Sequence, residues 1–247
     1  MIYKMKLEEK IKKKYLYSNK LNFFKLAYYF AHYIKSLFRR KIIYSNWSID
    51  LAVDFFFKNK KKGIYIDVGC HLPLLNNNTY LLYRRGWTGI NIDLDFNAID
   101  TFNFLRKKDT NVQACISNDE KIKELFFFHA RSAKNTLNEQ RGDGAKEILK
   151  IQTKTLNSII QNSPYSDKEI DFLSLDVEGS ELDVLQGFDI EKYKPKIIVA
   201  EYIPPTSKEF YEVNIADIID SNLYKFLINK NYKLINWIHD DLMFMRN

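Results

Sequence analysis

From residue 63 onward, short apolar runs alternate with segments in which apolar residues recur at helical spacing. The short runs predict buried strands, and the segments between them predict helices. The expected strands cover residues 64–68, 89–93, 111–116, 125–129, 170–175 and 196–200, and the expected helices cover residues 78–85, 98–107, 155–161 and 182–186. Strands that alternate with helices through short connections predict an α/β fold, in which a parallel sheet has helices on both faces.

The C-terminal segment has a different pattern. Residues 216–229 predict a helix, and residues 232–238 and 242–245 predict the two strands of a hairpin that turns at His239, Asp240 and Asp241. An antiparallel pair at the end of a parallel sheet is a permitted arrangement. We therefore expect a mostly parallel sheet that ends in an antiparallel strand.

The first 43 residues contain neither proline nor glycine and repeat apolar residues at helical intervals, which predicts an amphipathic helical arm. Residues 1–45 hold 12 Lys/Arg against 2 Asp/Glu, whereas the remaining residues hold 26 against 29. We expect two parts, a basic helical arm at 1–45 and a catalytic or binding domain at 46–247. A chain with a basic arm and a near-neutral domain does not favour a nucleic-acid partner.

The helical arm has two further interpretations. It packs against the core or against a second copy of the chain, which would form a homo-oligomer, or it rests as a peripheral contact on an anionic membrane surface. No signal peptide or transmembrane helix is expected. Cys70 and Cys115 lie far apart in apolar segments and form no disulfide framework, which indicates a cytoplasmic protein, with the inner membrane surface as the site of any peripheral contact.

Acidic residues follow four of the five parallel strands that contribute to the expected cleft. Ligands of a parallel sheet bind at the carboxyl ends of its strands, so these residues face one site. The strand-end residues are Asp67, Asp93, Asp176 with Glu178 and Glu181, and Glu201, while the third strand runs into Ser117 and Asn118.

The loop after the first strand departs from a dinucleotide-binding loop. Asp93 lies 24 residues after Gly69, a separation at which a carboxylate can accept the hydroxyls of a ribose. The loop lacks the other glycines of G-x-G-x-x-G, and Pro73 has no N–H for a pyrophosphate. A cofactor without phosphates and with a positive centre suits this acidic cleft, which favours S-adenosylmethionine. A NAD-dependent oxidoreductase and a non-catalytic sugar-binding domain are the alternatives of another class.

Four stretches resemble the FkbM family of S-adenosylmethionine-dependent methyltransferases, in order and with compatible spacing: DVGCHLPLLNNNTYLLYRRGWTGINID, KTLNSII, FLSLDVEGSELDVLQGFD and KPKIIVAEY. The resemblance runs over residues 64–247, and the D-V-E-G-x-E-x-x-V-L block is its most specific part. It implies a Rossmann-like class I methyltransferase fold, with a seven-stranded sheet and an antiparallel last strand. It also implies O-methylation of a sugar, polyketide or related hydroxyl.

The same resemblance implies the cofactor contacts. It places the cofactor against Asp67, Gly69, Asn78, Thr79, Asp93, Ser117 and Asp176. The commonest members have A-N-x-G after D-x-G, whereas this chain has Cys70 and His71 there and is more similar to a subgroup with D-V-G-A-H-x-P.

Four residues are candidates for the chemistry of the acceptor. His71 and Asp176 compete as the base that removes the hydroxyl proton, and Glu178 and Glu201 are further catalytic candidates. A divalent metal held by His71, Asp176 and Glu201 is an alternative. The long polar loop around Ser132 resembles a substrate lid, and its basic residues could meet the phosphates of a nucleotide sugar.

These observations predict an S-adenosylmethionine-dependent O-methyltransferase. Its small-molecule substrate is expected to be a sugar or nucleotide sugar used in surface polysaccharide biosynthesis. A lipid-linked, polyketide or phosphoramidate oxygen is the alternative acceptor.

Overall fold

The computed structural model describes residues 22–37, 43–204 and 213–247. The chain divides into two units, Met1–Ile42 and Ile43–Asn247. Helix α2 (Asn22–Leu37) is the described part of the first unit. The remainder of the predicted arm before residue 43 lies outside the described residues.

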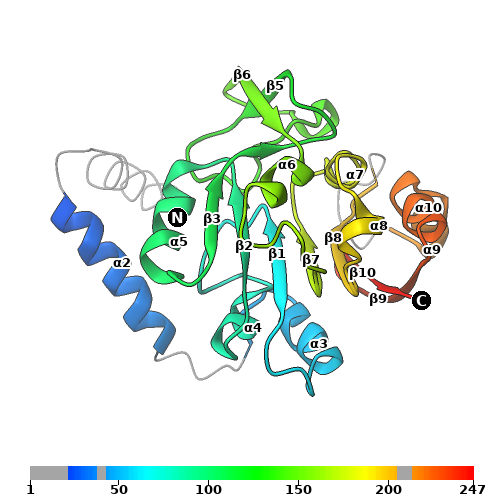
Figure 1. The fold of residues 1–247 in the computed structure, drawn as a ribbon. Coiled ribbons are helices and arrows are strands. Elements are labelled where there is room, and N and C mark those ends of the chain that lie inside the picture. Colours follow the sequence, from blue (N-terminus) through cyan, green and yellow to red (C-terminus); the bar gives the residue numbers. More distant parts are fainter. Residues whose placement is uncertain (1–21, 38–42, 205–212) are drawn as a thin grey trace. The chain divides into compact units, whose positions relative to one another are not determined.

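Seven strands of the second unit form one sheet (Figure 1), in the order β3-β2-β1-β7-β8-β10-β9. The strands are β1 (Ile64–Val68), β2 (Thr88–Asp93), β3 (Thr110–Gln113), β7 (Phe172–Leu175), β8 (Ile197–Glu201), β9 (Tyr232–Ile238) and β10 (Asp241–Arg246). Strand β10 runs antiparallel to both β8 and β9, and the remaining pairs are parallel. This sheet confirms the predicted mostly parallel, seven-stranded fold with an antiparallel last strand.

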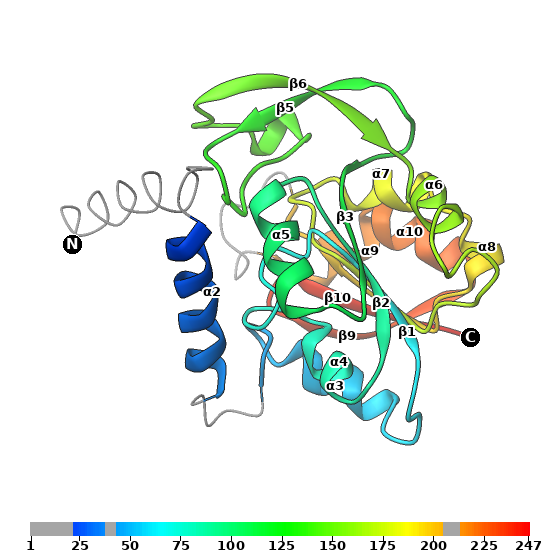
Figure 2. The ribbon, with the colours of Figure 1, turned by 60° about the vertical axis from the view of Figure 1, so that its left-hand side comes forward.

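Helices cover both faces of the sheet (Figure 2), because successive residues of each strand point to opposite faces. On β1, Ile66 and Val68 belong to the larger core cluster, whereas Tyr65 belongs to the cluster on the other face. The larger cluster includes residues of α6 (Leu156–Gln161), α7 (Glu181–Gln186), α8 (Ile190–Tyr193), α9 (Ile215–Asp220) and α10 (Asn222–Asn229). The opposite face is covered by α3 (Ile49–Phe56), α4 (Tyr80–Arg84) and α5 (Phe96–Leu105).

A second sheet of three strands lies beyond the carboxyl ends of β1 and β2 (Figures 1 and 2), in the order β4-β6-β5. Its strands are β4 (Cys115–Ile116), β5 (Ile122–Phe127) and β6 (Glu147–Lys154). The predicted strand at 111–116 is therefore two strands, because the chain leaves the main sheet after Gln113 and pairs Cys115 with Thr153 of β6. Strand β6 was not predicted, since most of its residues are exposed and show no clear apolar alternation.

Two helical segments differ from the sequence prediction. The helix expected at 216–229 is interrupted at Ser221, whose backbone is extended and whose hydroxyl accepts from the N–H of Tyr224 to cap α10. Helix α3 was not predicted, although Ile49, Val53 and Phe57 recur at four-residue spacing and are buried. That spacing is the signal that would have identified it.

Candidate active site

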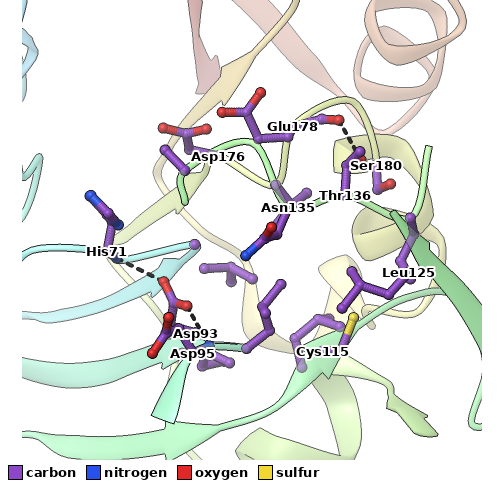
Figure 3. Close-up of a pocket in the computed structure, with 18 of the residues that line it drawn as sticks. His71, Asp93, Asp95, Cys115, Leu125, Asn135, Thr136, Asp176, Glu178 and Ser180 are labelled. Atoms are coloured by element: carbon purple, nitrogen blue, oxygen red, sulfur yellow. Dashed lines mark hydrogen bonds between the residues drawn. The ribbon is translucent and has the colours of Figure 1, made fainter. Parts of the chain in front are cut away.

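A pocket opens at the carboxyl ends of β1, β2, β4 and β7, and the loop between β5 and β6 forms part of its wall (Figure 3). It contains about 710 Å³ of empty space, part of it open to solvent, which is within the range of small-molecule sites. Five of the predicted site residues line this pocket: Gly69, His71, Asp93, Asp176 and Glu178. Figure 3 shows Asp93 on one side of it, and Asp176 and Glu178 on the other.

The Asp93 carboxylate is held in place by the backbone. Its Oδ2 accepts from the N–H of His71 at 2.9 Å, and its Oδ1 accepts from the N–H of Asp95 at 2.8 Å. Burial raises the pKa of Asp93 to about 6. Each oxygen retains a further lone pair, so a fixed carboxylate of this kind can accept hydrogen bonds from a pair of ligand hydroxyls.

Asp95 also lines the pocket and was not identified from the sequence. One of its oxygens accepts from the N–H of Asn97 and caps α5, and the other accepts from the N–H of Arg131. Asp95 thereby fixes the loop between β5 and β6 beside β2. An acidic residue two positions after a strand-end aspartate, just before a helix, was the available signal.

Gly69 allows the ends of β1 and β7 to approach closely. Its φ is +80°, and a Cβ at this position would lie 1.7 Å from the backbone oxygen of Asp176. Only glycine adopts this conformation in such a space without strain. The loop after β1 and the turn after β7 therefore meet in one pocket.

His71 lines the pocket from the loop after β1, with a φ of 46°. Burial and the nearby Arg131 guanidinium lower the pKa of its imidazole, while Asp95 opposes the shift. His71 is therefore neutral at pH 7 and able to accept a proton. Its charged neighbours Arg131 and Asp95 place it on the Asp93 side of the pocket.

Three carboxylates gather at the other side of the pocket, on the turn after β7 and at the end of β8. One oxygen each of Asp176, Glu178 and Glu201 lies within 4.8 Å of the others. Nη1 of Arg141 lies 3.1 Å from Glu178 and 2.6 Å from Glu201, so its positive charge is placed between two of them. We call Asp176, Glu178, Glu201 and Arg141 the acidic cluster.

Repulsion within the acidic cluster changes its titration. Restricted access to water and the carboxylates of Glu201 and Glu178 raise the pKa of Asp176 well above its ordinary value, although the side chain is open to the pocket. Burial and Glu201 raise the pKa of Glu178 to about 7, against the effect of Arg141. Carboxylates with raised pKa values are better proton acceptors near neutral pH than free ones.

Glu181 holds the turn that presents the acidic cluster. The side chain is buried, and its Oε1 accepts from the N–H groups of Val177 at 2.9 Å and Gly179 at 3.1 Å. Burial and the Glu201 carboxylate raise the pKa of Glu181 to about 8. The conformation of the D-V-E-G-S-E block thus depends on a side chain within the block.

The loop between β5 and β6 binds the same turn from outside. Thr136 Oγ1 donates to the carbonyl of Glu178 at 2.8 Å, and Asn138 Nδ2 donates to the carbonyl of Gly179 at 3.0 Å. Gly179 has a φ of +95°, and a Cβ there would contact Asn138 at 2.6 Å. With Arg141 on the following 3-10 helix (Glu139–Arg141), this loop fixes both the backbone and the side chains of the turn.

Two residues that were predicted to bind the cofactor, Asp67 and Thr79, belong instead to a buried hydrogen-bond network beneath the pocket. Asp67 Oδ2 accepts from Asn77 Nδ2 and from Thr79 Oγ1, both at 2.9 Å. Arg106, which has no exposed surface, donates to Asn77, Thr79 and Tyr65 and pairs with Asp109 at 2.9 Å. Neither Asp67 nor Thr79 lines the pocket, because their polar atoms are turned into this network.

The other predicted residues also lie outside the pocket lining. Asn78 donates to the hydroxyl of Ser174, and the Ser117 hydroxyl accepts from Nζ of Lys123. Glu201 lies beside the lining residues, within the acidic cluster. The sequence suggested a metal site of His71, Asp176 and Glu201. Among the described residues, the side chains spaced to hold a metal are Asp176, Glu178 and Glu201, so His71 is not part of the group. Arg141 already places a positive charge beside these carboxylates.

Comparison with known proteins identifies the family model of the methyltransferase FkbM domain over residues 67–234. No curated protein gives a match to the sequence. Among solved structures, the chain is similar to that described as monomeric WbdD, with 12% identity and a TM-score of 0.42. The similarity covers 81% of this chain and 40% of that one, so this chain spans less than half of the structure it matches.

Proposed function

We propose that this chain, which belongs to the FkbM family of methyltransferases, transfers a methyl group from S-adenosylmethionine to a hydroxyl oxygen of a sugar or nucleotide sugar. The observation that supports this most is the division of one pocket between a single fixed carboxylate, Asp93, and a cluster of carboxylates around Asp176. The first suits the ribose of the cofactor, and the second suits an acceptor rich in hydroxyl groups.

The cofactor side of the pocket fits S-adenosylmethionine in shape and charge. Asp93 presents two oxygens whose directions are set by backbone N–H groups. Apolar side chains adjoin it and can receive a flat ring: Ile92, Leu94, Ala114, Ile116 and Leu125. When bound, S-adenosylmethionine supplies an electrophilic methyl group on a positively charged sulfur, which acidic surroundings favour.

Asp176 is the proposed base. It lies at the end of β7, open to the pocket, and its carboxylate would accept the acceptor's proton as the new bond to carbon forms. His71 lines the same pocket on the side of Asp93, where it is better placed to border the cofactor. The enzyme's larger contribution is to hold the acceptor oxygen in line with the methyl group.

The acidic cluster favours a neutral, polyhydroxylated acceptor. Ionised carboxylates accept hydrogen bonds from hydroxyl groups and repel phosphates. Arg141, which could have met the phosphates of a nucleotide sugar, is instead paired with Glu178 and Glu201. In a nucleotide sugar the sugar ring would therefore contact the cluster, and the product would serve the biosynthesis of a surface polysaccharide.

Calorimetry with S-adenosylhomocysteine and with NAD tests the cofactor. We expect binding of the former only, and about tenfold weaker binding after Asp93→Asn, because one hydrogen-bond acceptor is lost. Asp167→Asn, at an exposed aspartate outside the pocket, is the matched control. A protein that binds NAD, or that fails to bind S-adenosylhomocysteine, would contradict the proposal.

Mass spectrometry with a panel of free sugars, nucleotide sugars, polyketides and lipid-linked acceptors tests the substrate class. We expect the mass of one methyl group to be added to a sugar. Methylation of a polyketide or a lipid-linked oxygen alone would retain the methyltransferase and replace the acceptor.

A further inference from the structure

Helix α2 presents a continuous stripe of apolar side chains to solvent. Leu26, Phe30, Tyr33 and Leu37 are 50%, 59%, 41% and 59% exposed. Their spacing of four, three and four residues places them on one side of the helix. Apolar residues gathered on one helical face commonly mark an interaction surface, whereas scattered ones do not.

The charged residues of α2 lie on the other side of the helix. At 100° per residue, Lys25, His32 and Lys35 fall more than a quarter-turn away from the middle of the stripe. Lys25 and Lys35 agree in sign with the surrounding sequence, because residues 1–45 contain 12 Lys/Arg and 2 Asp/Glu. A partner that is apolar where it meets the stripe and anionic around it matches this distribution.

The helix is suited to lie along a membrane and not to cross one. Its 16 residues correspond to about 24 Å, which is shorter than the hydrocarbon core of a bilayer. In the part of the chain that the structure describes, no helix is long and apolar enough to span a membrane.

We infer that α2 is a membrane-surface anchor, in which the stripe enters the headgroup region of an anionic bilayer and the basic residues contact lipid phosphates. An apolar face combined with an excess of lysine is what binds amphipathic helices to anionic membranes. The inference concerns the first unit of the chain and does not depend on the methyl-transfer reaction of the second. It would bring the enzyme to the membrane surface.

Vesicle flotation of the full chain tests the anchor. We expect the protein to float with vesicles that contain phosphatidylglycerol and to remain largely free with pure phosphatidylcholine. Binding should weaken as salt is raised, because screening reduces the attraction of lysine for the anionic surface. Equal binding to both vesicle types would overturn the inference.

Two sets of substitutions distinguish membrane binding through the stripe from nonspecific binding through exposed apolar side chains. Leu26→Gln, Phe30→Gln and Leu37→Gln together should lower the partition coefficient about tenfold or more. The matched control, Phe55→Gln, Ile122→Gln and Ile148→Gln, removes apolar side chains that are 65%, 67% and 56% exposed in the second unit. Similar losses in the two sets would overturn the inference.

Charge and self-association give independent readouts. Lys25→Gln with Lys35→Gln should weaken binding to anionic vesicles by about fivefold for each lysine and leave the affinity for S-adenosylhomocysteine unchanged. Light scattering reports whether a second copy covers the stripe instead. A dimer that the stripe variant converts to monomer, without vesicle binding by the wild type, would replace the membrane with a subunit contact.

Discussion

Two groups of charged side chains, one beneath the pocket and one at its wall, differ in how their charges are balanced. In the group beneath the pocket, Arg106 is enclosed by Asp109, Tyr65, Asn77 and Thr79, at 2.7–3.0 Å from their oxygens. Asp67 adjoins it and is bonded to the same Asn77 and Thr79. Two carboxylates and one guanidinium thus share a dense set of hydrogen bonds away from the pocket.

The acidic cluster is organised in the opposite way. Three carboxylates, with the buried Glu181 behind them, face one guanidinium, and Nη2 of Arg141 is buried without a hydrogen-bond partner. The side chain of Asp176 remains open to the pocket. An excess of one charge, exposed to a cavity, is costly unless a ligand compensates it.

The comparison indicates that the charged groups beneath the pocket stabilise the fold, whereas those of the acidic cluster are available to a ligand. Asp67 and Asp176 both lie at or near the carboxyl end of a parallel strand and are equivalent in a sequence pattern. The carboxylate of the first is engaged by hydrogen bonds from Asn77 and Thr79, and that of the second is left available. The following substitutions should therefore affect stability in one group and catalysis in the other.

Arg106→Met should have the largest effect. It leaves the buried Asp109 and Asp67 without their cation, which we expect to cost about 3–5 kcal/mol in the free energy of unfolding. Urea denaturation measures the loss. Arg246→Met is the control, because that arginine is paired with Glu191 at the surface, at 3.5 Å, and should cost less than about 1 kcal/mol. Equal losses would mean that the network beneath the pocket is not a structural unit.

Asp176→Asn should lower the rate of methyl transfer about a hundredfold or more, because the proposed proton acceptor is removed. The free energy of unfolding should not fall, since the substitution also removes repulsion by Glu178 and Glu201. His71→Gln should have the smaller effect on the rate at saturating cofactor. A greater loss of rate in the His71 variant would identify His71, and not Asp176, as the base.

Arg141→Met should reduce the rate about tenfold without abolishing it, because the arginine positions the cluster and is not expected to contact the reacting atoms. Loss of its charge would raise the pKa values of Glu178 and Glu201 further. The pH–rate profile should therefore move to higher pH, and Arg141→Lys should restore part of the shift. An unchanged profile would show that Arg141 does not control these carboxylates.

Glu181→Gln should have the smallest effect on the rate of methyl transfer and should change mainly the pH dependence of stability. The pKa of Glu181 is raised from 4.5 to about 8 in the folded chain, so the folded state binds the proton more tightly than the unfolded state. Its contribution to stability is complete below pH 4.5 and is lost as the pH rises towards 8, by up to about 1.4 kcal/mol per pH unit. Thermal unfolding across this interval should show a flatter dependence in the variant, in which glutamine can still accept from Val177 and Gly179. An unchanged slope would assign the dependence to other groups, such as Asp241, whose pKa burial and Asp240 raise to about 8.

Much of the fold could be read from local patterns. The buried strands β1, β2, β7 and β8 are short segments rich in apolar residues between turns, and each lies at the predicted place within a few residues. The small sheet could not be read in this way, because Ile148 and most of β6 are exposed and β4 has only two residues. The pairing of β4 with β6 joins segments nearly 40 residues apart, which no short-range pattern reports.

The residues of the candidate site could also be predicted only in part. The order of strands and their acidic ends was sufficient to bring Asp93, Asp176 and Glu178 to one pocket, since the ends of parallel strands meet at one edge of the sheet. Asp67 and Thr79 were also expected there. Whether a strand-end side chain turns towards the pocket depends on its partners, and for these two the partners are Asn77 and Arg106 beneath it.

The amino-acid sequence by itself determined the parallel sheet, the family and the acidic character of the cleft, because periodicity and short motifs are local properties of the chain. Only the tertiary structure decided which carboxylates are neutralised and which are available. Arg141 reaches Glu178 and Glu201 across 37 and 60 residues of sequence. Arg106 reaches Asn77, Tyr65 and Thr79 across 29, 41 and 27 residues, so these contacts arise from packing of separate elements. Charge balance at a site is a property of that packing, so it could not be read from the order of residues.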